Sequence, residues 1–484
     1  MVSAIAPIVA PRNTFVKNVA KPMVHFASNT VRNTRRSKFI VTNSNGQKVH
    51  KTIKLPETMT CTKDSCVLPT QKKRVVIIGS GWGAVSIAKN LKDNENNEYI
   101  FVSPRNYMLY TPLLPSVVGG VVSENSIMEP IRNIVAGKGT YYEAKATDID
   151  VDGKRVICDD GDHLFEVEYD TLVCSVGSVS ATFGIPGVEE NCLFLKNMED
   201  ARKLRVHTNR CIERAALPCI TPEERKKLLS FVIVGCGPTG VETAAEIFDL
   251  VEEYSKKLPA EIIKDVNITL VDGMKTMLSS YDGDIQRYAT ELFERRNIIL
   301  RFESFVKSVS PGAVEIKTND GVDTVEFGTC VWSAGITMHP LTKMIKNKIG
   351  DTQDSNRGLL VDDRLKVIGA EDIICIGDAA IIQGKSLPPT AQVAKSQAEY
   401  IANVFNAAVT YPYNYFHKGS LVYLGDEMGA LDLPFKLPFF RTILGRAGGD
   451  TYKVYETVSQ VSFRTQVHVA YDWVRTKLFG RITI

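Results

Sequence analysis

Two short segments of the chain carry residue types that suit the binding of dinucleotide phosphates. Residues 75–84 read VVIIGSGWGA and residues 231–240 read FVIVGCGPTG, so each is an apolar, β-branched run that breaks into a G-x-G pattern. Glycines there permit a tight turn and a close approach of the backbone to a pyrophosphate, while the following helix offers free N–H groups to the anion. One such motif also occurs as plain α/β scaffolding. Two of them predict two dinucleotide sites, an arrangement typical of electron transfer between the bound groups.

The glycines of each motif have separate roles. In the first motif, Gly79 allows the turn after the strand, Gly81 admits the pyrophosphate and Ala84 keeps the helix close to the sheet. The same three roles fall to Gly235, Gly237 and Gly240 in the second motif, and the predicted cradles also include Trp82, Gly83, Pro238 and Thr239.

An acidic residue indicates which nucleotide the second motif binds. Asp272 follows a short predicted strand at residues 268–271. A carboxylate at this place pairs with both ribose hydroxyls of NADH and repels the 2′-phosphate of NADPH. Its distance from the glycines exceeds the usual ~20 residues, because a predicted helical stretch at 249–265 lengthens the crossover. We therefore expect a preference for NADH.

Length and charge limit the class of protein. A chain of 484 residues with 44% hydrophobic and 23% charged residues is typical of a soluble protein of two or three domains. Residues 1–56 hold ten of the 58 Lys and Arg residues and no Asp or Glu, so the rest of the chain is net acidic. That balance disfavours a nucleic-acid partner. The acid-free, Arg-containing leader predicts a mitochondrial transit peptide, and the alternative is a disordered basic arm.

Two further patterns bear on possible redox or metal sites. The ten cysteines show no C-x-x-C pair and no zinc or iron–sulfur spacing, and we expect most of them to be reduced and structural. Asp148, Asp150 and Asp152 match the start of a calcium loop. Arg155 stands at the usual apolar eighth position, however, and Asp152-Gly153 lies between alternating runs that favour a hairpin. No metal is predicted, and no apolar run reaches the length of a spanning helix.

The order of predicted strands and helices suggests that the second nucleotide domain is inserted into the first. The predicted divisions are 1–71 for the transit peptide and flexible leader, 72–193 and 333–404 for the two parts of the first nucleotide domain, 194–332 for the second nucleotide domain, and 405–484 for a C-terminal cap.

Four strings extend the argument to a known family. The segments SPRNYMLYTPLLPSVVGG from residue 103, VEYDTLVCSVGS from 167, VIVGCGPTGVETAAE from 232 and LPPTAQVAKSQAEY from 387 resemble type II NADH dehydrogenases, the single-subunit, rotenone-insensitive NADH:quinone oxidoreductases. The resemblance runs from about residue 73 to the C-terminus. It implies an α/β fold of the glutathione-reductase type with two dinucleotide-binding domains, non-covalent FAD in the first and NADH as co-substrate in the second. It also implies a C-terminal domain that docks on the membrane and dimerises.

The resemblance also implies site residues. No acidic residue ends the second strand, so Ser103 and Arg105 are expected to hold FAD in its place. The carboxylate of Asp378 is expected to accept a hydrogen bond from the ribityl chain, although a helix N-cap is the alternative. Further expected flavin residues are Thr111, Pro112, Leu113, Gly177, Gly377 and Ala379, and Gly335 is expected beside NADH.

Glu242 and three residues near 395 are the expected reaction residues. Glu242 lies just inside the helix after Gly240, where a carboxylate is favoured by the helix dipole, and in the family it faces the nicotinamide and the flavin. We expect it to orient the reactants; the alternative is that it only stabilises its helix, and Glu246 is the more purely structural residue. The family motif A-Q-x-A-x-Q is changed here, since Ser396 replaces its second glutamine. The expected quinone contacts are Gln392, Ser396 and Gln397.

The C-terminal cap contains a predicted basic amphipathic helix. Its apolar face comprises Phe463, Val467, Ala470, Val474 and Leu478, with Trp473 nearby and Arg464, His468, Arg475, Lys477 and Arg481 around the rest. Such a helix suits a bilayer interface, although it could instead face the core. Residues 433–441 add apolar bulk.

The combined prediction is a ping-pong NADH:quinone oxidoreductase that pumps no protons. It would lie peripherally on the inner mitochondrial membrane, on the matrix side, as a homodimer, and its quinone would reach the flavin under the cap. The first alternative is a sulfide:quinone reductase, which needs two cysteines flanking the flavin and no working NADH site, and the intact second motif with Asp272 argues against it. The second is a signalling flavoprotein of the apoptosis-inducing-factor kind, which expects a basic surface, and the net acidic charge after residue 56 disfavours it.

Overall fold

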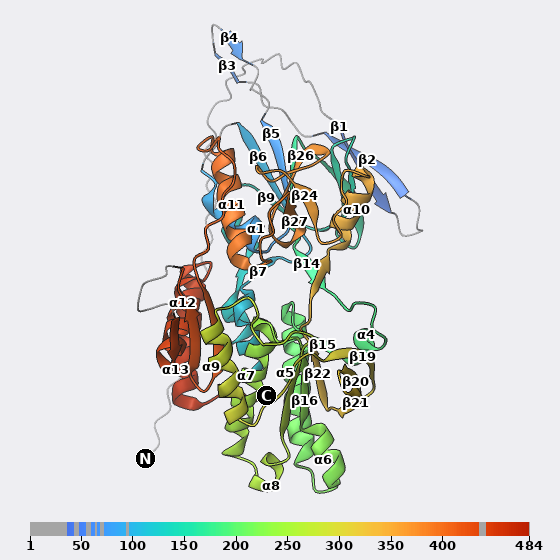
Figure 1. Cartoon of the computed structure of the whole chain (residues 1–484). Helices are drawn as coiled ribbons and strands as arrows, with labels where there is room; N and C mark the ends of the chain where they lie inside the picture. The colour runs from blue at the N-terminus through green and yellow to red at the C-terminus, as the bar shows by residue number, and fades with distance from the viewer. Residues whose placement is uncertain are drawn as a thin grey trace, which may run out of the picture. The chain divides into compact units, whose positions relative to one another are not determined.

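The computed structural model describes residues 72–92, 96–434 and 442–483, together with the backbone of four strands ahead of them (Figure 1). Most of the predicted transit peptide, and residues 435–441 of the apolar segment in the cap, lie outside the described residues. The four early strands are β1 (Arg36–Thr42), β2 (Lys48–Lys54), β3 (Thr60–Thr62) and β4 (Ser65–Val67). β1 pairs antiparallel with β12 (His163–Glu168), and β3 pairs with β4.

An eight-stranded sheet carries the first glycine motif. Its order is β27-β24-β25-β26-β13-β5-β6-β9, and its five strands from β26 to β9 run parallel. Because β24 to β27 come from late in the chain, the sheet joins segments on both sides of the second motif. The strand bounds are β5 (Lys73–Ile78), β6 (Asn97–Ser103), β9 (Thr140–Glu143), β13 (Thr171–Cys174), β24 (Leu359–Val361), β25 (Lys366–Val367), β26 (Ala370–Cys375) and β27 (Ala380–Ile382).

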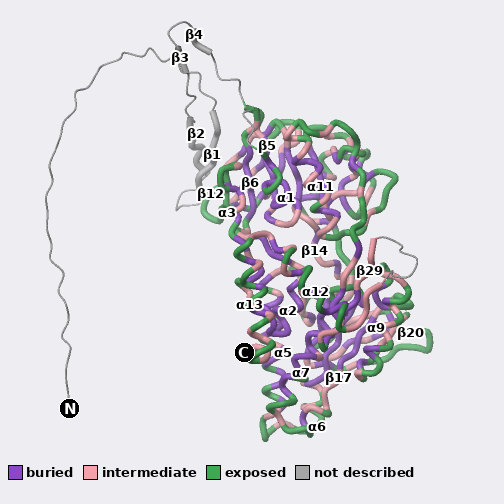
Figure 2. Tube along the Cα trace, turned by 90° about the vertical axis from the view of Figure 1, so that its left-hand side faces the viewer, coloured by how far each residue is buried: buried purple, intermediate pink, exposed green. Residues whose placement is uncertain are grey.

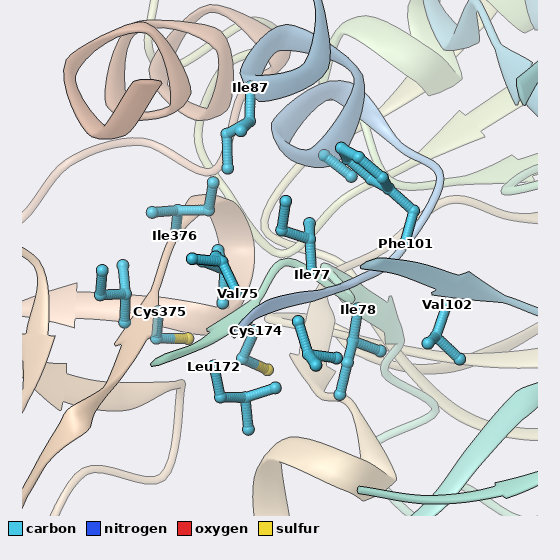
Figure 3. Packing of buried hydrophobic residues seen from close by; sticks show 14 of the residues in the cluster. Val75, Ile77, Ile78, Ile87, Phe101, Val102, Leu172, Cys174, Cys375 and Ile376 are labelled. Atoms are coloured by element: carbon cyan, nitrogen blue, oxygen red, sulfur yellow. The ribbon is translucent and has the colours of Figure 1, made fainter. Parts of the chain in front are cut away.

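The centre of this sheet is apolar on both faces, which explains the unbroken β-branched run before Gly79. Val76 and Ile77 of β5 are fully buried, and Ile87 of α1 (Trp82–Asn90) belongs to the same buried cluster as Ile77 (Figure 3). Helix α11 (Ala391–Phe405) packs along α1 (Figure 1). The same region contains α3 (Ile131–Val135) and α10 (Pro340–Ile349).

A five-stranded parallel sheet carries the second motif, in the order β15-β22-β16-β17-β18. Its strands are β15 (Leu193–Phe194), β16 (Ser230–Val234), β17 (Asn267–Val271), β18 (Ile299–Arg301) and β22 (Thr329–Trp332). Its helices are α5 (Met198–Ala215), α6 (Pro222–Leu228), α7 (Pro238–Ser255), α8 (Ala260–Ile263) and α9 (Gly283–Arg295). Helices α7 and α8 together occupy most of the stretch that was predicted to lengthen the crossover.

Smaller elements connect and flank the two sheets. Antiparallel strands form two of these groups, with β10 (Lys145–Asp150) and β11 (Arg155–Asp159) beside β12, and with β19 (Phe305–Ser310), β20 (Ala313–Thr318) and β21 (Gly321–Glu326). The remaining elements of the nucleotide-binding part are β7 (Tyr107–Leu109), η1 (Thr111–Leu113), α2 (Leu114–Val118), η2 (Glu124–Ile127), β8 (Met128–Pro130), β14 (Ser178–Ser180), α4 (Val188–Asn191), β23 (Ile336–Met338) and η3 (Gly377–Ala379).

The C-terminal cap consists of three antiparallel strands and two helices. They are β28 (Ser420–Gly425), β29 (Met428–Asp432), β30 (Thr442–Gly445), α12 (Arg446–Val458) and α13 (Phe463–Phe479). β28 packs against α7, and α12 packs against β29 and α13. Buried residues follow the strands of both parallel sheets, whereas exposed residues recur along α13 (Figure 2).

Candidate active site

The first glycine turn leaves an open, uncapped helix end. Gly79 has φ +125°, and a Cβ there would lie 2.6 Å from the Ser175 carbonyl oxygen, so only glycine fits. Gly81 is the N-cap of α1, receives no side-chain cap, and a Cβ added to it would have nothing within 4 Å. The N–H groups of the first turn are therefore free for an anion. Close packing on the sheet occurs at Gly83, where a Cβ would lie 3.0 Å from the Ile376 side chain, one residue before the predicted Ala84.

The second turn has the same construction. Gly235 has φ +104°, and a Cβ on Gly240 would lie 1.9 Å from the Gly235 carbonyl oxygen. Gly237 is the N-cap of α7 without a side-chain cap, and nothing lies within 4 Å of a Cβ there. Pro238 and Thr239, which open the helix, are exposed. The turn thus offers both space and unpaired donors.

The structure brings Asp272 to this second turn. Its Oδ2 accepts a hydrogen bond from the Cys236 N–H at 2.5 Å, and its Oδ1 accepts one from the Met274 N–H at 2.7 Å. These bonds fix the carboxylate between the end of β17 and the glycines. The side chain is half-buried, beside the turn at which the NADH ribose is expected.

Two of the predicted flavin residues meet through a serine that the sequence reasoning did not single out. Ser103 Oγ donates to Ser80 Oγ at 2.9 Å, and Arg105 Nε donates to the same oxygen at 3.3 Å. Ser80 lies inside the first glycine motif, so its position there was the available signal. The three residues link the glycine turn to the end of β6.

Trp82 and Thr111 form a second link on this side. Trp82 Nε1 donates to Thr111 Oγ1 at 3.0 Å, and its ring meets that of Tyr110 edge-on at 5.0 Å. The bond connects α1 to η1, which contains Pro112 and Leu113. Residues expected to surround one flavin therefore lie together.

Asp378 is not a helix N-cap, the alternative role that the sequence offers for it. It lies within η3, whose N-cap is Ile376, so the N-cap alternative is wrong. Its Oδ2 accepts a hydrogen bond from Ser178 Oγ at 2.8 Å and lies 3.9 Å from Lys196 Nζ. Lys196, which also donates to Ser178 Oγ at 3.2 Å, was not predicted, because nothing in its local sequence distinguishes it from a surface lysine.

The three expected quinone residues occupy different surroundings. Gln392 Oε1 accepts hydrogen bonds from the Tyr415 hydroxyl at 2.5 Å and from the Lys418 N–H at 2.9 Å. Ser396 Oγ accepts one from the Tyr413 hydroxyl at 3.1 Å. Both are thus held by the segment that leads into the cap.

Gln397 instead faces the η3 side of its helix. It is 2% exposed, and its Oε1 accepts a hydrogen bond from the Gly377 N–H at 2.6 Å. Its amide oxygen is therefore committed to holding the Gly377 turn. This places Gln397 beside the residues expected to hold the flavin, in contrast to the half-buried Gln392 and Ser396.

Glu242 is buried where α7 meets the cap. Its Oε1 accepts a hydrogen bond from the Tyr423 N–H of β28 at 3.1 Å. Burial raises the pKa of Glu242 well above the ordinary glutamate value, and the neighbouring Glu456 and Glu246 raise it further, while the bonds from Tyr423 and Tyr452 oppose the shift. This environment favours the uncharged carboxyl. The predicted benefit of a carboxylate at the helix end is correspondingly reduced.

Glu246 has the structural role that was predicted for it. Its Oε1 accepts a hydrogen bond from Ser116 Oγ at 2.7 Å, and its Oε2 lies 2.5 Å from Arg481. Arg481 also reaches Asp249 at 2.7 Å, and its side chain is 11% exposed. Arg481, near the end of the described residues, therefore forms ion pairs with α7, the helix that follows the second glycine turn.

Two expected glycines have left-handed backbones, with φ +72° at both Gly177 and Gly335. Nothing lies near a Cβ on Gly177, whereas a Cβ on Gly335 would lie 2.4 Å from the exposed ring of Phe183. Gly335 lies three residues after β22, in the sheet that carries the second motif, and Gly177 lies three residues after β13, in the sheet that carries the first.

The acidic calcium-like segment is a hairpin. Asp150 accepts hydrogen bonds from the Gly153 N–H at 2.9 Å and from Arg155 at 2.5 Å, and these hold the turn between β10 and β11. No group of three acidic, histidine or cysteine side chains suited to a metal occurs in the described part of the chain.

The cap helix presents the predicted apolar face to solvent, but only part of the predicted basic face, with His468 and Lys477 exposed and unpaired with any described carboxylate. Phe463 is 80% exposed and Leu478 is 68% exposed, and the other three predicted apolar positions are exposed as well. Three of the basic residues instead bind protein groups, which is a correction to the expected basic rim: Arg464 pairs with Glu129, Arg475 with Asp472, and Arg481 with Glu246 and Asp249.

Trp473 also differs from its expected place as an interfacial anchor. Its Nε1 donates to Thr457 Oγ1 at 3.2 Å, and Lys453 lies over its ring. From α13 it packs against α12, half-buried at the edge of the core. Among the described residues, no helix is both long and apolar enough to cross a bilayer.

Comparison with known proteins agrees with this geometry. Residues 73–398 match the family model for pyridine nucleotide-disulphide oxidoreductases, and residues 417–482 match the NDH2 C-terminal domain. The chain is 35% identical to the mitochondrial external alternative NADH-ubiquinone oxidoreductase of Yarrowia lipolytica, with 85% of this chain and 80% of the relative covered. It is 36% identical to a probable NADH dehydrogenase of Dictyostelium discoideum, with 85% and 91% covered.

Solved structures give the same result. NDH2 from Plasmodium falciparum in complex with NADH superposes with a TM-score of 0.81 at 28% identity, covering 86% of this chain and all of that one. The sulfide:quinone oxidoreductase of Aquifex aeolicus has a TM-score of 0.64 at 20% identity, covering 85% of this chain and 96% of that one, and shares the fold alone. These matches confirm the predicted fold class. The chain belongs to the type II NADH:quinone oxidoreductases, the NDH2 family.

Proposed function

We propose that this protein oxidises NADH and reduces a membrane ubiquinone, with non-covalently bound FAD between the two substrates and without proton pumping. The observation that carries the proposal is the pair of open, uncapped glycine turns, each at the carboxyl end of a parallel strand in its own sheet. Mitochondrial relatives named NADH-ubiquinone oxidoreductases support the choice of substrates.

The residues at the first turn fit a bound FAD. The free N–H groups after Gly81 suit its pyrophosphate, and the space at Gly81 lets the phosphates approach the backbone. Ser103 and Arg105 would hold the adenosine end, and Asp378 would accept from the ribityl chain. When bound, the flavin supplies an acceptor for the hydride of NADH and a donor for quinone.

The chain's own residues would bind and orient the substrates. Asp272 is held by two backbone N–H groups in a position to accept from both ribose hydroxyls of NADH. Gln392 and Ser396, fixed from the cap by Tyr415 and Tyr413, would contact the quinone. Glu242, buried beside the second turn, would orient the nicotinamide as an uncharged hydrogen-bonding group.

Anaerobic spectroscopy tests the sequence of electron transfer. The purified protein should carry a flavin that is released by denaturation without proteolysis, which is the property of non-covalent FAD. NADH should bleach the flavin absorbance in the absence of oxygen, and a soluble ubiquinone should then restore it. A protein without flavin, or a flavin that NADH does not bleach, would contradict the proposal.

We further propose that the outer face of α12 and α13 rests on the lipid surface of the inner mitochondrial membrane. The exposed apolar side chains on these helices are Val454, Val458, Phe463, Val467, Tyr471, Val474, Leu478 and Phe479. Many exposed apolar side chains on two packed helices are unfavourable in water, and a lipid surface would cover them. The protein would therefore be a peripheral membrane enzyme.

We also propose a homodimer on the matrix side. The acid-free leader supports import, whereas several relatives are named external enzymes. Protease access in intact mitochondria and in mitoplasts distinguishes the two faces, and light scattering of the purified enzyme gives the oligomeric state.

Sulfide oxidation is the second candidate function. It would need two cysteines beside the flavin. Among the described cysteines, Cys174 and Cys375 lie side by side on the neighbouring buried strands β13 and β26 (Figure 3). The Sγ atoms of Cys192 and Cys330 lie 3.4 Å apart in a separate buried cluster. These positions favour packing over catalysis.

A further inference from the structure

A cluster of buried acidic and phenolic side chains lies between the cap and the two glycine turns. Glu456 and Tyr452 are on α12 and Glu242 is on α7, while Tyr110 immediately precedes η1. Glu456 is 4% exposed, and the two tyrosines are each 2% exposed. Neither Glu456 nor Tyr110 has a place in the function proposed above.

Two tyrosines of this cluster lie beside its carboxyl groups. The Tyr452 hydroxyl faces the Glu242 carboxyl, and the Tyr110 hydroxyl faces the Glu456 carboxyl. The Tyr110 ring in turn meets the ring of Trp82, in the first glycine motif, with the ring centroids 5.0 Å apart. Glu456 and the Tyr110 hydroxyl therefore lie next to residues expected around the flavin.

The second carboxyl oxygen of Glu456 has no partner. Glu456 Oε2 and Gln460 Oε1 are both buried acceptors without a hydrogen bond, and Gln460 is itself 4% exposed. Gln460 lies four residues after Glu456, just beyond the end of α12, and its Nε2 donates to the Glu456 carbonyl oxygen at 2.8 Å. Two unpaired buried acceptors are unfavourable. A proton on Glu456 supplies the missing donor, either to Gln460 or to a molecule that enters beside it.

The described groups that face the cluster include no cation, and burial favours a proton on Glu456. Glu242 and Glu246 face the cluster from α7, Tyr423 from β28, Tyr281 from the loop before α9, and Tyr110 from the flavin side. In the described part of the chain, Glu456 forms no ion pair. Burial raises the pKa of Glu456 to about 7, against the opposing effect of the Tyr110 hydrogen bond. The group can therefore gain and lose a proton near neutral pH.

We propose that Glu456 stores the proton consumed in quinone reduction and passes it to the quinone through the Tyr110 hydroxyl. The inference rests on the proposed function. Hydride leaves NADH with two electrons and one proton, whereas a quinone takes two electrons and two protons to become a quinol, so one proton must come from elsewhere. The Tyr110 O–H bond breaks as a quinone oxygen is protonated, the Glu456 O–H bond breaks to restore Tyr110, and solvent reprotonates the Glu456 carboxylate.

The pH dependence of two acceptor reactions tests this role. With a soluble ubiquinone, the wild-type rate should fall about tenfold per pH unit above about 7, as the protonated fraction of Glu456 falls. Glu456→Gln should be slower at neutral pH and should lose this alkaline limb. With ferricyanide, which accepts electrons without protons, the variant and the wild type should have the same profile.

Glu427→Gln is the matched control. It removes a carboxylate with a 47% exposed side chain, which lies between β28 and β29 and pairs with Lys453 of α12, the helix that carries Glu456. It should retain the wild-type profile with both acceptors. An alkaline limb that persists in Glu456→Gln would overturn the proposal, and so would equal losses with quinone and ferricyanide, which would indicate a structural role.

Two further measurements keep the result decisive if Glu456→Gln does not fold. Tyr110→Phe removes only the relaying hydroxyl and should also lose the limb. Infrared spectroscopy should show a protonated carboxyl band that titrates near neutral pH in the wild type and in Glu242→Gln; its absence would overturn the proposal. This band is independent of turnover, so a wild type that shows it but does not reduce quinone would count against the proposed function instead.

Discussion

The buried contact between Arg481 and α7 predicts that the end of the chain controls how firmly the cap is attached. Arg481 lies 2.5 Å from Glu246 and 2.7 Å from Asp249, with side-chain exposures of 11%, 2% and 8% for the three residues. Arg481→Met would remove the cation and leave two buried carboxylates without a counter-charge. Loss of one partner from a buried pair costs about 3–5 kcal/mol, so we expect a loss of that size in the free energy of unfolding.

Urea denaturation followed by tryptophan fluorescence measures this loss, because Trp473 lies between α12 and α13. Arg481→Met combined with Glu246→Gln and Asp249→Asn should recover most of the stability, since no charge is then left unpaired. Lys477→Met, which removes an exposed cation from the last turn of α13, four residues before Arg481, is the control and should change stability by less than about 0.5 kcal/mol. If Arg481→Met lowers the free energy of unfolding by less than about 1 kcal/mol, the buried ion pair of Arg481 does not hold the cap to α7.

Three other predictions address the nucleotide, the membrane and the effect of pH. Asp272→Asn should narrow the preference of kcat/KM for NADH over NADPH, and unchanged selectivity would remove Asp272 from the nucleotide site. Replacing Phe463, Val474 and Leu478 together by Ser should release the protein from liposomes in a sedimentation assay, because each inserted side chain contributes up to roughly 1.5–3 kcal/mol; Val322→Ser, at an exposed apolar position on β21, should have no effect. Burial would raise the pKa of Glu129, but hydrogen bonds from Ser462, Asn133 and Arg464 outweigh it and lower that pKa. Its stabilising contribution is therefore present above the ordinary glutamate pKa and is lost as the pH falls through the depressed value. Urea denaturation over a range of acidic pH should show this loss in the wild type, and Glu129→Gln should flatten the dependence.

The parts of the site that depend on local sequence could be predicted. The glycine turns are local, because the β-branched strand, the two close glycines and the helix are contiguous at both motifs. Asp272 could be found because it directly follows a strand. The domain boundaries at 193, 332 and 404 remain predictions, although the eight-stranded sheet contains strands from both sides of residues 194–332.

Contacts between distant segments could not be predicted from one sequence. Lys196 meets Asp378, and Tyr110 meets Glu456, across long separations in the chain, and neither pair has a local pattern. Arg481 was expected beside lipid because helical periodicity places a residue on a face without saying what covers that face. The exposed apolar positions of α13 follow that periodicity, whereas its inner face is recognised only through the burial of Val469 and Asp472.

The stoichiometry of NADH oxidation with a soluble ubiquinone tests the proposed reaction directly. We expect one quinol to form for each NADH consumed, no sensitivity to rotenone, and no replacement of NADH by sulfide as the electron donor. Failure to form quinol from NADH, or reduction of quinone by sulfide instead, would contradict the proposed reaction.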